Sequence, residues 1–229
     1  MPDSTKEPQN QSQYVSYKEN GPMTAGPWTT HIGRSDPRHL AFLLARYKFV
    51  SKMLFGKKHA LEVGCGDAFG TPLVLQEVDR VTGIDFEPLI IKDLKNRLQT
   101  GFLPNFSCHI HDMTEAPLSE KFDSSYSLDV IEHISPDLEH VFLENIVKSL
   151  SENAILLMGT PNITASKYAS EASMEGHINL KSGETMRTLL NPYFENVFIF
   201  SMNDEVVHTG FLPMSHYIIG MGVGLKKLN

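Results

Sequence analysis

The residues best suited to chemistry in this sequence lie where apolar segments end. The run "HALEVGCGDAFG" (59–70) closes with Gly64, Cys65 and Gly66, and glycines let a ligand lie directly against the backbone. About 20 residues later Asp85 ends the next apolar segment, where a carboxylate can accept hydrogen bonds from both hydroxyls of a ribose. A tight turn and a helix-capping Asp would explain each feature alone, but the combination favours a nucleoside site.

The spacing of the glycines narrows the class of nucleoside. Gly64, Gly66 and Gly70 form a G-x-G-x-x-x-G pattern, which matches neither the phosphate-binding G-x-x-x-x-G-K-[ST] loop nor the G-x-G-x-x-G dinucleotide turn. A pyrophosphate is therefore not indicated. Asp112 ends a third apolar segment and could accept a hydrogen bond from the exocyclic amine of adenine, with Met113 packing on the ring.

Strand-like and helical segments alternate through most of the chain, which is typical of βαβ units and a mostly parallel α/β sheet. Ligands of such a sheet lie beyond the carboxyl ends of the strands, near the point where the strand order reverses, so we expect the glycine turn and the acids to meet there. The last two strand candidates, "NVFIFSM" (196–202) and "SHYIIGMGVGLK" (215–226), have no helix between them. They predict an antiparallel hairpin at the edge of the sheet.

Five segments in order resemble the motifs of class I S-adenosylmethionine-dependent methyltransferases: "LEVGCGDAFG", "GIDFEP", "HDMT", "FDSSYSLDVIEHI" and "LLMGTPN". They cover residues 60–162. The resemblance implies a Rossmann-like, doubly wound sheet of seven strands, mostly parallel, with its last strand antiparallel. It also implies S-adenosylmethionine as cofactor, a cation that suits a pocket with several acids at its rim.

Positions within the motifs imply a role for each cofactor residue. The glycine turn would lie beneath the methionine part, and the acid at the end of the first strand would orient that turn. Two later acids would hold the ribose and the adenine amine, two apolar side chains would flank the ring, and the end of the fourth strand would line the sulfonium pocket. The glycine turn is Gly64, Cys65 and Gly66, and the acid that would orient it is Glu62. Asp85 would hold the ribose and Asp112 the adenine amine. Phe86 and Met113 would flank the ring, and Leu128 and Asp129 would line the sulfonium pocket.

The "DVIEH" and "TPN" segments are most similar to ubiquinone-biosynthesis O-methyltransferases and to small-RNA terminal 2′-O-methyltransferases. His133 or His177 would act as a general base, since imidazole titrates near neutral pH. Alternatively, the acid, Glu and His pattern implies a divalent ion such as Mg²⁺, which would bring two neighbouring hydroxyls together and lower the pKa of one. Its implied ligands are Asp129, Glu132, His133 and His177. A structural role for both histidines is the third alternative.

Composition limits the partners and the compartment. The chain has 229 residues and a formal net charge of −7, which disfavours nucleic acid because phosphate contacts need clustered Lys and Arg. The two cysteines lack metal-type spacing, and no signal core or membrane-length apolar run is present. We therefore expect a cytoplasmic protein without membrane association.

The first 22 residues are polar and predict a mobile arm, with a single methyltransferase domain over residues 23–229. Trp28, the only tryptophan, either anchors a loop or belongs to a lid over the pocket. Three arginines, Arg34, Arg38 and Arg46, are candidates to meet an anion on the acceptor. We expect methyl transfer to a hydroxyl of a small molecule or glycan. The alternatives are N-methylation, RNA 2′-O-methylation, and a non-catalytic cofactor-binding subunit of a partner enzyme.

Overall fold

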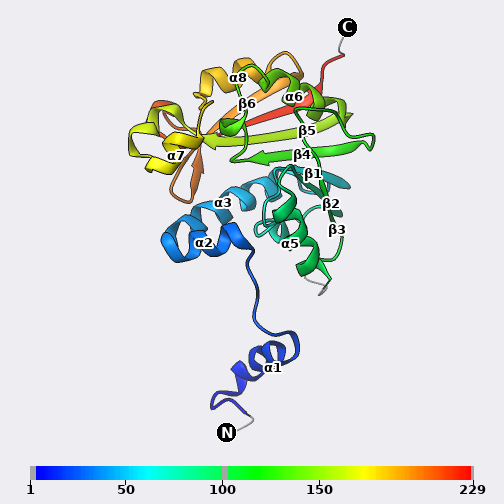
Figure 1. Ribbon diagram of the computed structural model, residues 1–229, viewed down its shortest axis with the longest axis vertical. Coiled ribbons are helices and arrows are strands. Elements are labelled where there is room, and N and C mark those ends of the chain that lie inside the picture. Colours follow the sequence, from blue (N-terminus) through cyan, green and yellow to red (C-terminus); the bar gives the residue numbers. More distant parts are fainter. Residues whose placement is uncertain (1–3, 100–102, 228–229) are drawn as a thin grey trace.

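The computed structural model describes residues 4–99 and 103–227, and in this part of the chain eight strands form one sheet (Figure 1). The parallel pairs confirm the predicted doubly wound α/β architecture. In spatial order the strands are β3 (Phe106–Ile110), β2 (Arg80–Asp85), β1 (His59–Val63), β4 (Phe122–Leu128), β5 (Leu150–Pro161), β8 (Tyr217–Leu225), β6 (Phe194–Asn203) and β7 (Val206–His208).

The C-terminal strands differ from the expected seven-stranded sheet in one respect. Strands β6 and β8 pair antiparallel as predicted, and β8 also pairs antiparallel with β5, so that it lies between them. The eighth strand, β7, occupies the edge and comes from the segment "NDEVVHTG" between the two strand candidates, where no strand was predicted. Asp204 turns the chain there with a φ of 49°, which lets Val206 pair with Asn203.

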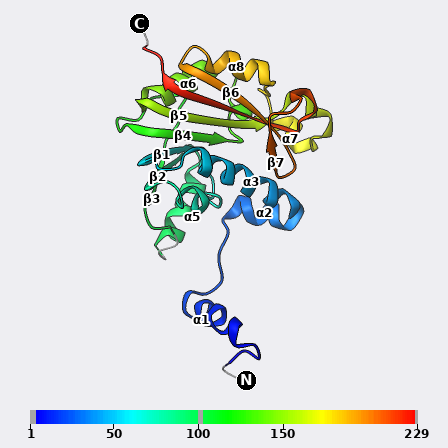
Figure 2. The ribbon, with the colours of Figure 1, turned by 180° about the vertical axis from the view of Figure 1, so that it is seen from behind.

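Helices cover both faces of the sheet. Figures 1 and 2 show α3 (Arg38–Met53) and α5 (Pro88–Leu98) on one side, and α6 (Glu139–Lys148) and α8 (Gly183–Leu190) on the other. The short α4 (Thr71–Val74) follows the glycine turn. Each long helix buries one apolar stripe against the strands. The buried residues include Val50 of α3, Ile91 and Leu94 of α5, Phe142 and Ile146 of α6, and Met186 and Leu190 of α8.

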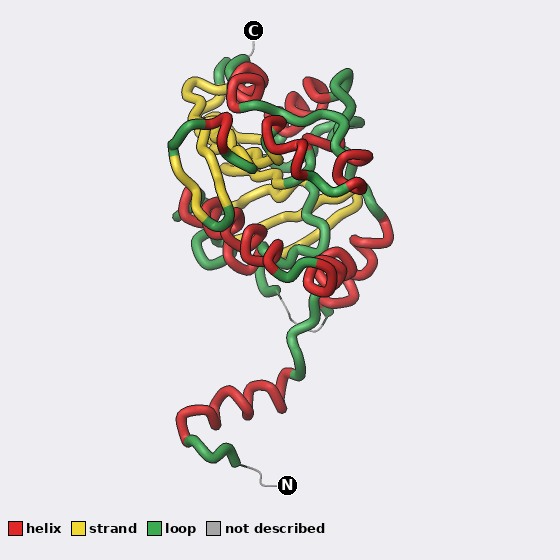
Figure 3. Tube along the Cα trace, turned by 90° about the vertical axis from the view of Figure 1, so that its left-hand side faces the viewer, coloured by secondary structure: helices red, strands yellow, loops and turns green. Residues whose placement is uncertain are grey.

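The polar N-terminal region contains regular structure. Its helix α1 (Gln11–Asn20) lies apart from the sheet at the end of an extended segment, as Figures 1 and 3 show. Residues 1–3 of the predicted arm and 228–229 of the predicted domain lie outside the described residues. The remaining elements are η1 (Pro8–Asn10), α2 (Pro27–Ser35), η2 (Ile131–His133), η3 (Ile163–Tyr168), α7 (Glu171–Gly176) and η4 (Leu212–Met214). Among the described helices, none combines the length and apolarity that crossing a bilayer requires.

The strand order reverses between β1 and β4, which are neighbours in the sheet although β2 and β3 separate them in the chain. Loops leave the carboxyl ends of these two strands in opposite directions, and the opening between them is where ligands of such sheets bind. The glycine turn follows β1 and the "DVIEH" segment follows β4, so the fold brings the two motifs to this point.

Candidate active site

The turn after β1 depends on glycine at two positions. Gly64 and Gly66 have φ angles of 74° and 48°, a region where other side chains are strained. A Cβ on Gly64 would lie 2.3 Å from Cγ2 of Val130. The N–H groups of Gly64 and Cys65 donate to the carbonyl oxygen of Ile84 at 2.8 and 2.9 Å. The side chain of Cys65 is buried in the core, so only its backbone takes part in the turn.

Glu62 lies buried beneath this turn. Its Oε1 accepts a hydrogen bond from the Tyr47 hydroxyl at 2.8 Å, and its Oε2 accepts one from the Thr71 hydroxyl at 2.7 Å. Burial raises the pKa of Glu62 to about 7, although both hydrogen bonds act to lower it. Since Tyr47 belongs to α3 and Thr71 begins α4, the carboxyl group ties two helices to the end of β1, where it can orient the turn.

Asp85 ends β2 beside the turn. Its Oδ2 accepts from the N–H of Gly66 at 3.0 Å and its Oδ1 from the N–H of Glu87 at 2.9 Å. A carboxylate oxygen can accept more than one hydrogen bond, so both oxygens remain able to accept from a ribose hydroxyl. The neighbouring Phe86 is 70% exposed and offers its ring to a planar ligand.

The third acid, Asp112, follows β3. Its Oδ1 accepts from the N–H and the hydroxyl of Thr114, both at 2.7 Å, which fixes the carboxylate locally. The next residue, Met113, is 3% exposed and belongs to the same core cluster as Ile84. With its side chain in the core, Met113 exposes almost no surface to a ring beside β3 in this structure. Of the two residues expected to flank the ring, only Phe86 presents a surface.

At the end of β4, the buried Leu128 is followed by Asp129, which has a φ of 58°. The Oδ2 of Asp129 accepts from Nη1 of Arg46 at 2.7 Å, and the Arg46 guanidinium lies 3.8 Å from the centre of the Tyr217 ring. Burial alone would lower the pKa of Arg46, but Asp129 and Tyr217 outweigh it and the pKa is raised. Arg46 is therefore a partner of Asp129 and is not available to bind an acceptor anion.

Glu132, His133 and His177 converge next to this ion pair. One ligand atom from each of the three lies within 4.8 Å of the other two, and the two imidazole rings are 5.1 Å apart. Asp129 is not part of this group, because its carboxylate binds Arg46. The structure thus brings together three of the four residues implied as metal ligands, and both candidate bases.

The buried carboxyl of Glu132 is only half satisfied. Its Oε2 accepts from the Thr160 hydroxyl at 3.0 Å, while no described group donates to Oε1. Burial, and then the charge of Asp129, raise the pKa of Glu132 to about 8. Burial and the neighbouring His133 lower the pKa of His177, so this imidazole is neutral near pH 7. An unpaired oxygen beside two imidazoles can serve a proton or a metal ion.

A hydrogen bond defines which nitrogen of His133 carries its proton. Nδ1 of His133 lies 2.9 Å from the carbonyl oxygen of Gly176. Because a carbonyl oxygen only accepts, Nδ1 is the donor, and in the neutral ring Nε2 keeps its lone pair. Such an outer hydrogen bond is the usual means of orienting a ligating or basic imidazole.

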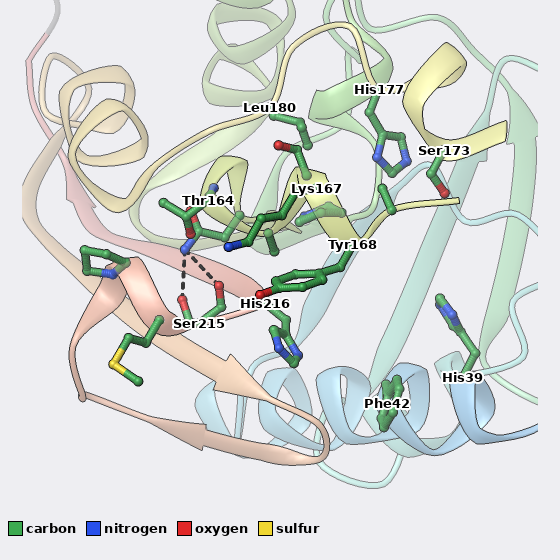
Figure 4. A pocket seen from close by; sticks show the side chains of 17 residues that line it. His39, Phe42, Thr164, Lys167, Tyr168, Ser173, His177, Leu180, Ser215 and His216 are labelled. Carbon is green, nitrogen blue, oxygen red and sulfur yellow. Dashed lines mark hydrogen bonds between the residues drawn. The ribbon is translucent and has the colours of Figure 1, made fainter. Parts of the chain in front are cut away.

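A cavity of about 730 Å³ opens beside His177 (Figure 4). It is lined from α3, the η3 segment after β5, and the residues before β8. None of the residues implied for cofactor binding lines it. The cavity is thus lined by His177, a candidate base, but not by the glycine turn.

Helix α2 covers the glycine turn. The N–H of Thr29 donates to Oδ2 of the buried Asp67 at 2.5 Å, and a Cβ on Gly66 would lie 3.5 Å from Cδ1 of Trp28. Asp67 therefore binds the first turn of the helix, where orphan N–H groups favour a carboxylate. The contacts attach α2 to the turn and also place Trp28 over it, so the anchor and the lid both stay predictions for Trp28.

Two consecutive residues of α3 are part of the site although no motif indicated their roles. Arg46 reaches Asp129 and Tyr47 reaches Glu62, over separations of 83 and 15 residues. The only signal in the sequence is a pair of polar groups inside the apolar helix segment "AFLLARYKFV" (41–50).

Comparisons with known proteins agree with this geometry. A family model described as "Methyltransferase domain" matches residues 54–197, more than half of the chain. The curated protein "Ubiquinone biosynthesis O-methyltransferase" of Coxiella burnetii is 26% identical over 147 residues, which cover 63% of this chain. The match spans 61% of that relative, less than two thirds of its length.

Solved structures share the fold at lower identity. The N-methyltransferase NodS from Bradyrhizobium japonicum WM9, in complex with S-adenosyl-L-homocysteine, has a TM-score of 0.60 and 19% identity, covering 92% of this chain and 97% of its own. A complex between the Trm112 methyltransferase activator and a methyltransferase of Haloferax volcanii gives a TM-score of 0.67 at 13% identity, with coverages of 88% and 96%.

Proposed function

Because this chain belongs to the methyltransferase domain family, we propose that it transfers the methyl group of S-adenosylmethionine to a hydroxyl group of a small molecule or glycan. S-adenosylmethionine is the methyl donor. The observation that supports oxygen as the acceptor atom is the convergence of Glu132, His133 and His177 beside the cavity. We assign the reaction to residues 23–229 and to the cytoplasm, with residues 1–22 as a mobile arm.

We propose that the cofactor lies along the carboxyl ends of β1 to β4. Gly64 and Gly66 leave room for the methionine part, the two carboxylate oxygens of Asp85 accept from the ribose hydroxyls, and Asp112 accepts from the adenine amine. Phe86 covers one face of the ring. In this position the sulfonium lies near the end of β4, between the glycine turn and the histidines.

The reaction is an in-line displacement. The acceptor oxygen forms a bond to the methyl carbon while the carbon–sulfur bond breaks, and the electron pair of that bond neutralises the sulfonium. The hydroxyl proton goes to a base, and His177 is suited to take it because burial keeps its imidazole neutral near pH 7. Positioning of the oxygen opposite the sulfur supplies much of the acceleration.

The same three residues fit a divalent cation. An unpaired carboxylate oxygen of Glu132 and two imidazoles form a mixed O and N donor set, which suits first-row transition ions better than Mg²⁺, because Mg²⁺ prefers oxygen ligands. As the alternative to a His177 base, we therefore propose Glu132, His133 and His177 as ligands, without Asp129, because an imidazole that binds an ion through its free lone pair cannot also take the proton. An ion bound there would lower the pKa of an acceptor hydroxyl.

A direct assay distinguishes methyl transfer to oxygen from methyl transfer to nitrogen. The protein is incubated with S-adenosylmethionine carrying a labelled methyl group and with paired acceptors that differ only in a hydroxyl or an amine, before and after chelation and reloading with Zn²⁺ or Mn²⁺. We expect transfer to hydroxyls, and a loss of about 10²-fold or more in His177→Ala with cofactor affinity unchanged. His140→Ala, an exposed histidine on α6, is the matched control.

The other functions give different results in this assay. An N-methyltransferase methylates the amine partner and keeps its activity in His177→Ala. An RNA 2′-O-methyltransferase requires an RNA 3′ end as acceptor, which the net charge of −7 disfavours. A non-catalytic subunit binds the cofactor without turnover on any acceptor until its partner is added.

A further inference from the structure

The wall of the acceptor cavity is depleted of negative charge. The chain contains 27 acidic residues among 229, so a lining of 17 residues would hold about two at that frequency. No Asp or Glu is among the 17 residues that line this cavity, whereas Lys167 and three histidines are. In a protein with a net charge of −7, this cavity is a local exception to the overall charge.

Lys167 is the only permanently charged residue of this lining. It belongs to η3, and its ammonium group lies 4.9 Å from the centre of the Tyr168 ring. No carboxylate of the described residues forms an ion pair with it, so its charge is not neutralised within the protein. Figure 4 shows Lys167 in the middle of the cavity wall beside Thr164, with the Tyr168 ring extending toward His216. The hydroxyls of Thr164 and Tyr168 add hydrogen-bonding groups next to the ammonium.

Apolar side chains make up much of the rest of the wall. Phe42, Leu180 and Met214 provide apolar surface, while His177 connects the cavity to Glu132 and His133. A ligand that fills the cavity therefore meets an imidazole at one place, apolar side chains, and an ammonium group without a carboxylate partner. The imidazole, the apolar side chains and the ammonium group would each contact a different part of one ligand molecule.

We infer that the acceptor is a small organic anion whose carboxylate or phosphate binds Lys167, whose apolar body lies on Phe42 and Tyr168, and whose hydroxyl faces His177. This inference rests on the proposed function, because it assigns the cavity to the acceptor. An ammonium group with adjacent hydroxyl donors forms charge-assisted hydrogen bonds to either kind of oxyanion. The absence of carboxylates from the lining removes repulsion of the anion.

Binding of three related probes tests this inference without requiring the natural acceptor. Benzoate, phenyl phosphate and the neutral benzamide are titrated into the protein by calorimetry or protein NMR, with and without S-adenosylhomocysteine. We expect saturable binding of at least one anion, at least about tenfold tighter than benzamide. Whether benzoate or phenyl phosphate binds more tightly distinguishes a carboxylate from a phosphate acceptor.

Variants then locate the anion. Lys167→Gln should weaken binding of the anion about tenfold and leave benzamide unchanged, and Lys167→Arg should retain most of the affinity. Lys92→Gln removes the same charge from an exposed position on α5, outside the cavity, and should have no effect. The inference is wrong if neither anion saturates, if benzamide binds as tightly, or if Lys167→Gln binds like the wild type. If S-adenosylhomocysteine binds to the wild type but neither anion does, only this inference is overturned. If S-adenosylhomocysteine itself does not bind, the proposed function is overturned.

Discussion

Arg46 and Asp129 join α3 to the end of β4 through an ion pair of 2.7 Å whose two sides are unequally buried: 10% of the Arg46 side chain is exposed, against 36% of the Asp129 side chain. Asn adopts the left-handed φ of position 129 as readily as Asp does, so Asp129→Asn removes charge without backbone strain. We expect Asp129→Asn to lower the free energy of unfolding by about 2 kcal/mol, because the buried guanidinium loses its counter-charge.

Replacing Arg46 instead of Asp129 should lower the free energy of unfolding by less. In Arg46→Met the thioether replaces the apolar part of the side chain, and water can solvate the partly exposed Asp129 carboxylate. Urea unfolding of both variants measures the difference. An equal or larger loss in Arg46→Met would show that the pair is stabilised mainly through Arg46 packing on Tyr217.

Glu132 should make the stability of the protein fall as pH rises. Its folded-state pKa of about 8 lies above the unfolded value of 4.5, so its protonated form is favoured in the folded state. The contribution is complete below about pH 4.5 and is lost as pH increases toward about 8, by at most about 1.4 kcal/mol per pH unit. Relative to wild type, Glu132→Gln should therefore gain stability over this window.

Glu62 should also make the stability of the protein fall as pH rises, which allows a comparison with Glu132. Its folded-state pKa of about 7 narrows the window to between about pH 4.5 and 7. Free energies of unfolding at pH 5, 6, 7 and 8 for wild type, Glu132→Gln and Glu62→Gln test both expectations. A difference between Glu132→Gln and wild type that does not change with pH would mean that Glu132 is ionised in the folded protein.

Asp85 should contribute to cofactor affinity through the ribose and through the turn. Replacing it with Ala removes the acceptor for the Gly66 N–H as well as the ribose contact. We expect Asp85→Ala to weaken binding of S-adenosylhomocysteine by about 1–3 kcal/mol, measured by calorimetry. Asp79→Ala, an exposed aspartate just before β2, is the control. Unchanged affinity in Asp85→Ala would contradict the ribose assignment.

Trp28 gives an optical signal for the cover over the turn. It is the only tryptophan, it is 54% exposed, and it lies next to Gly66. Binding of S-adenosylhomocysteine against the turn should shift its emission to shorter wavelength, because the indole loses contact with water. Asp67→Ala, which removes the acceptor for the Thr29 N–H, should reduce the shift. Emission that stays constant while calorimetry shows saturation would exclude a lid role.

Local patterns predicted the parts of the site that sit at strand ends. The family, the cofactor and the parallel sheet followed from ordered motifs, because glycine turns and strand-end acids have a sequence signature. The same patterns do not tell which way a side chain points. Cys65 and Met113 occupy motif positions, yet both side chains are buried in the core.

Contacts between distant segments could not be predicted in this way. Asp129 was assigned to the metal set by its position in a motif alone, but its partner Arg46 lies 83 residues away on α3. The three-residue β7 was missed because its pairing depends on the turn at Asp204, where a non-glycine residue adopts a positive φ. The Arg46–Asp129 contact and the pairing of β7 depend on tertiary packing, which overrides local propensity.

The most direct test of the account is a crystal structure with S-adenosylhomocysteine bound. The account predicts the ribose hydroxyls on Asp85, the amino-acid part over Gly64 and Gly66, and the sulfur directed toward His177 and the cavity that Lys167 lines. A sulfur atom directed away from His177, or a ligand bound elsewhere on the molecule, would contradict it.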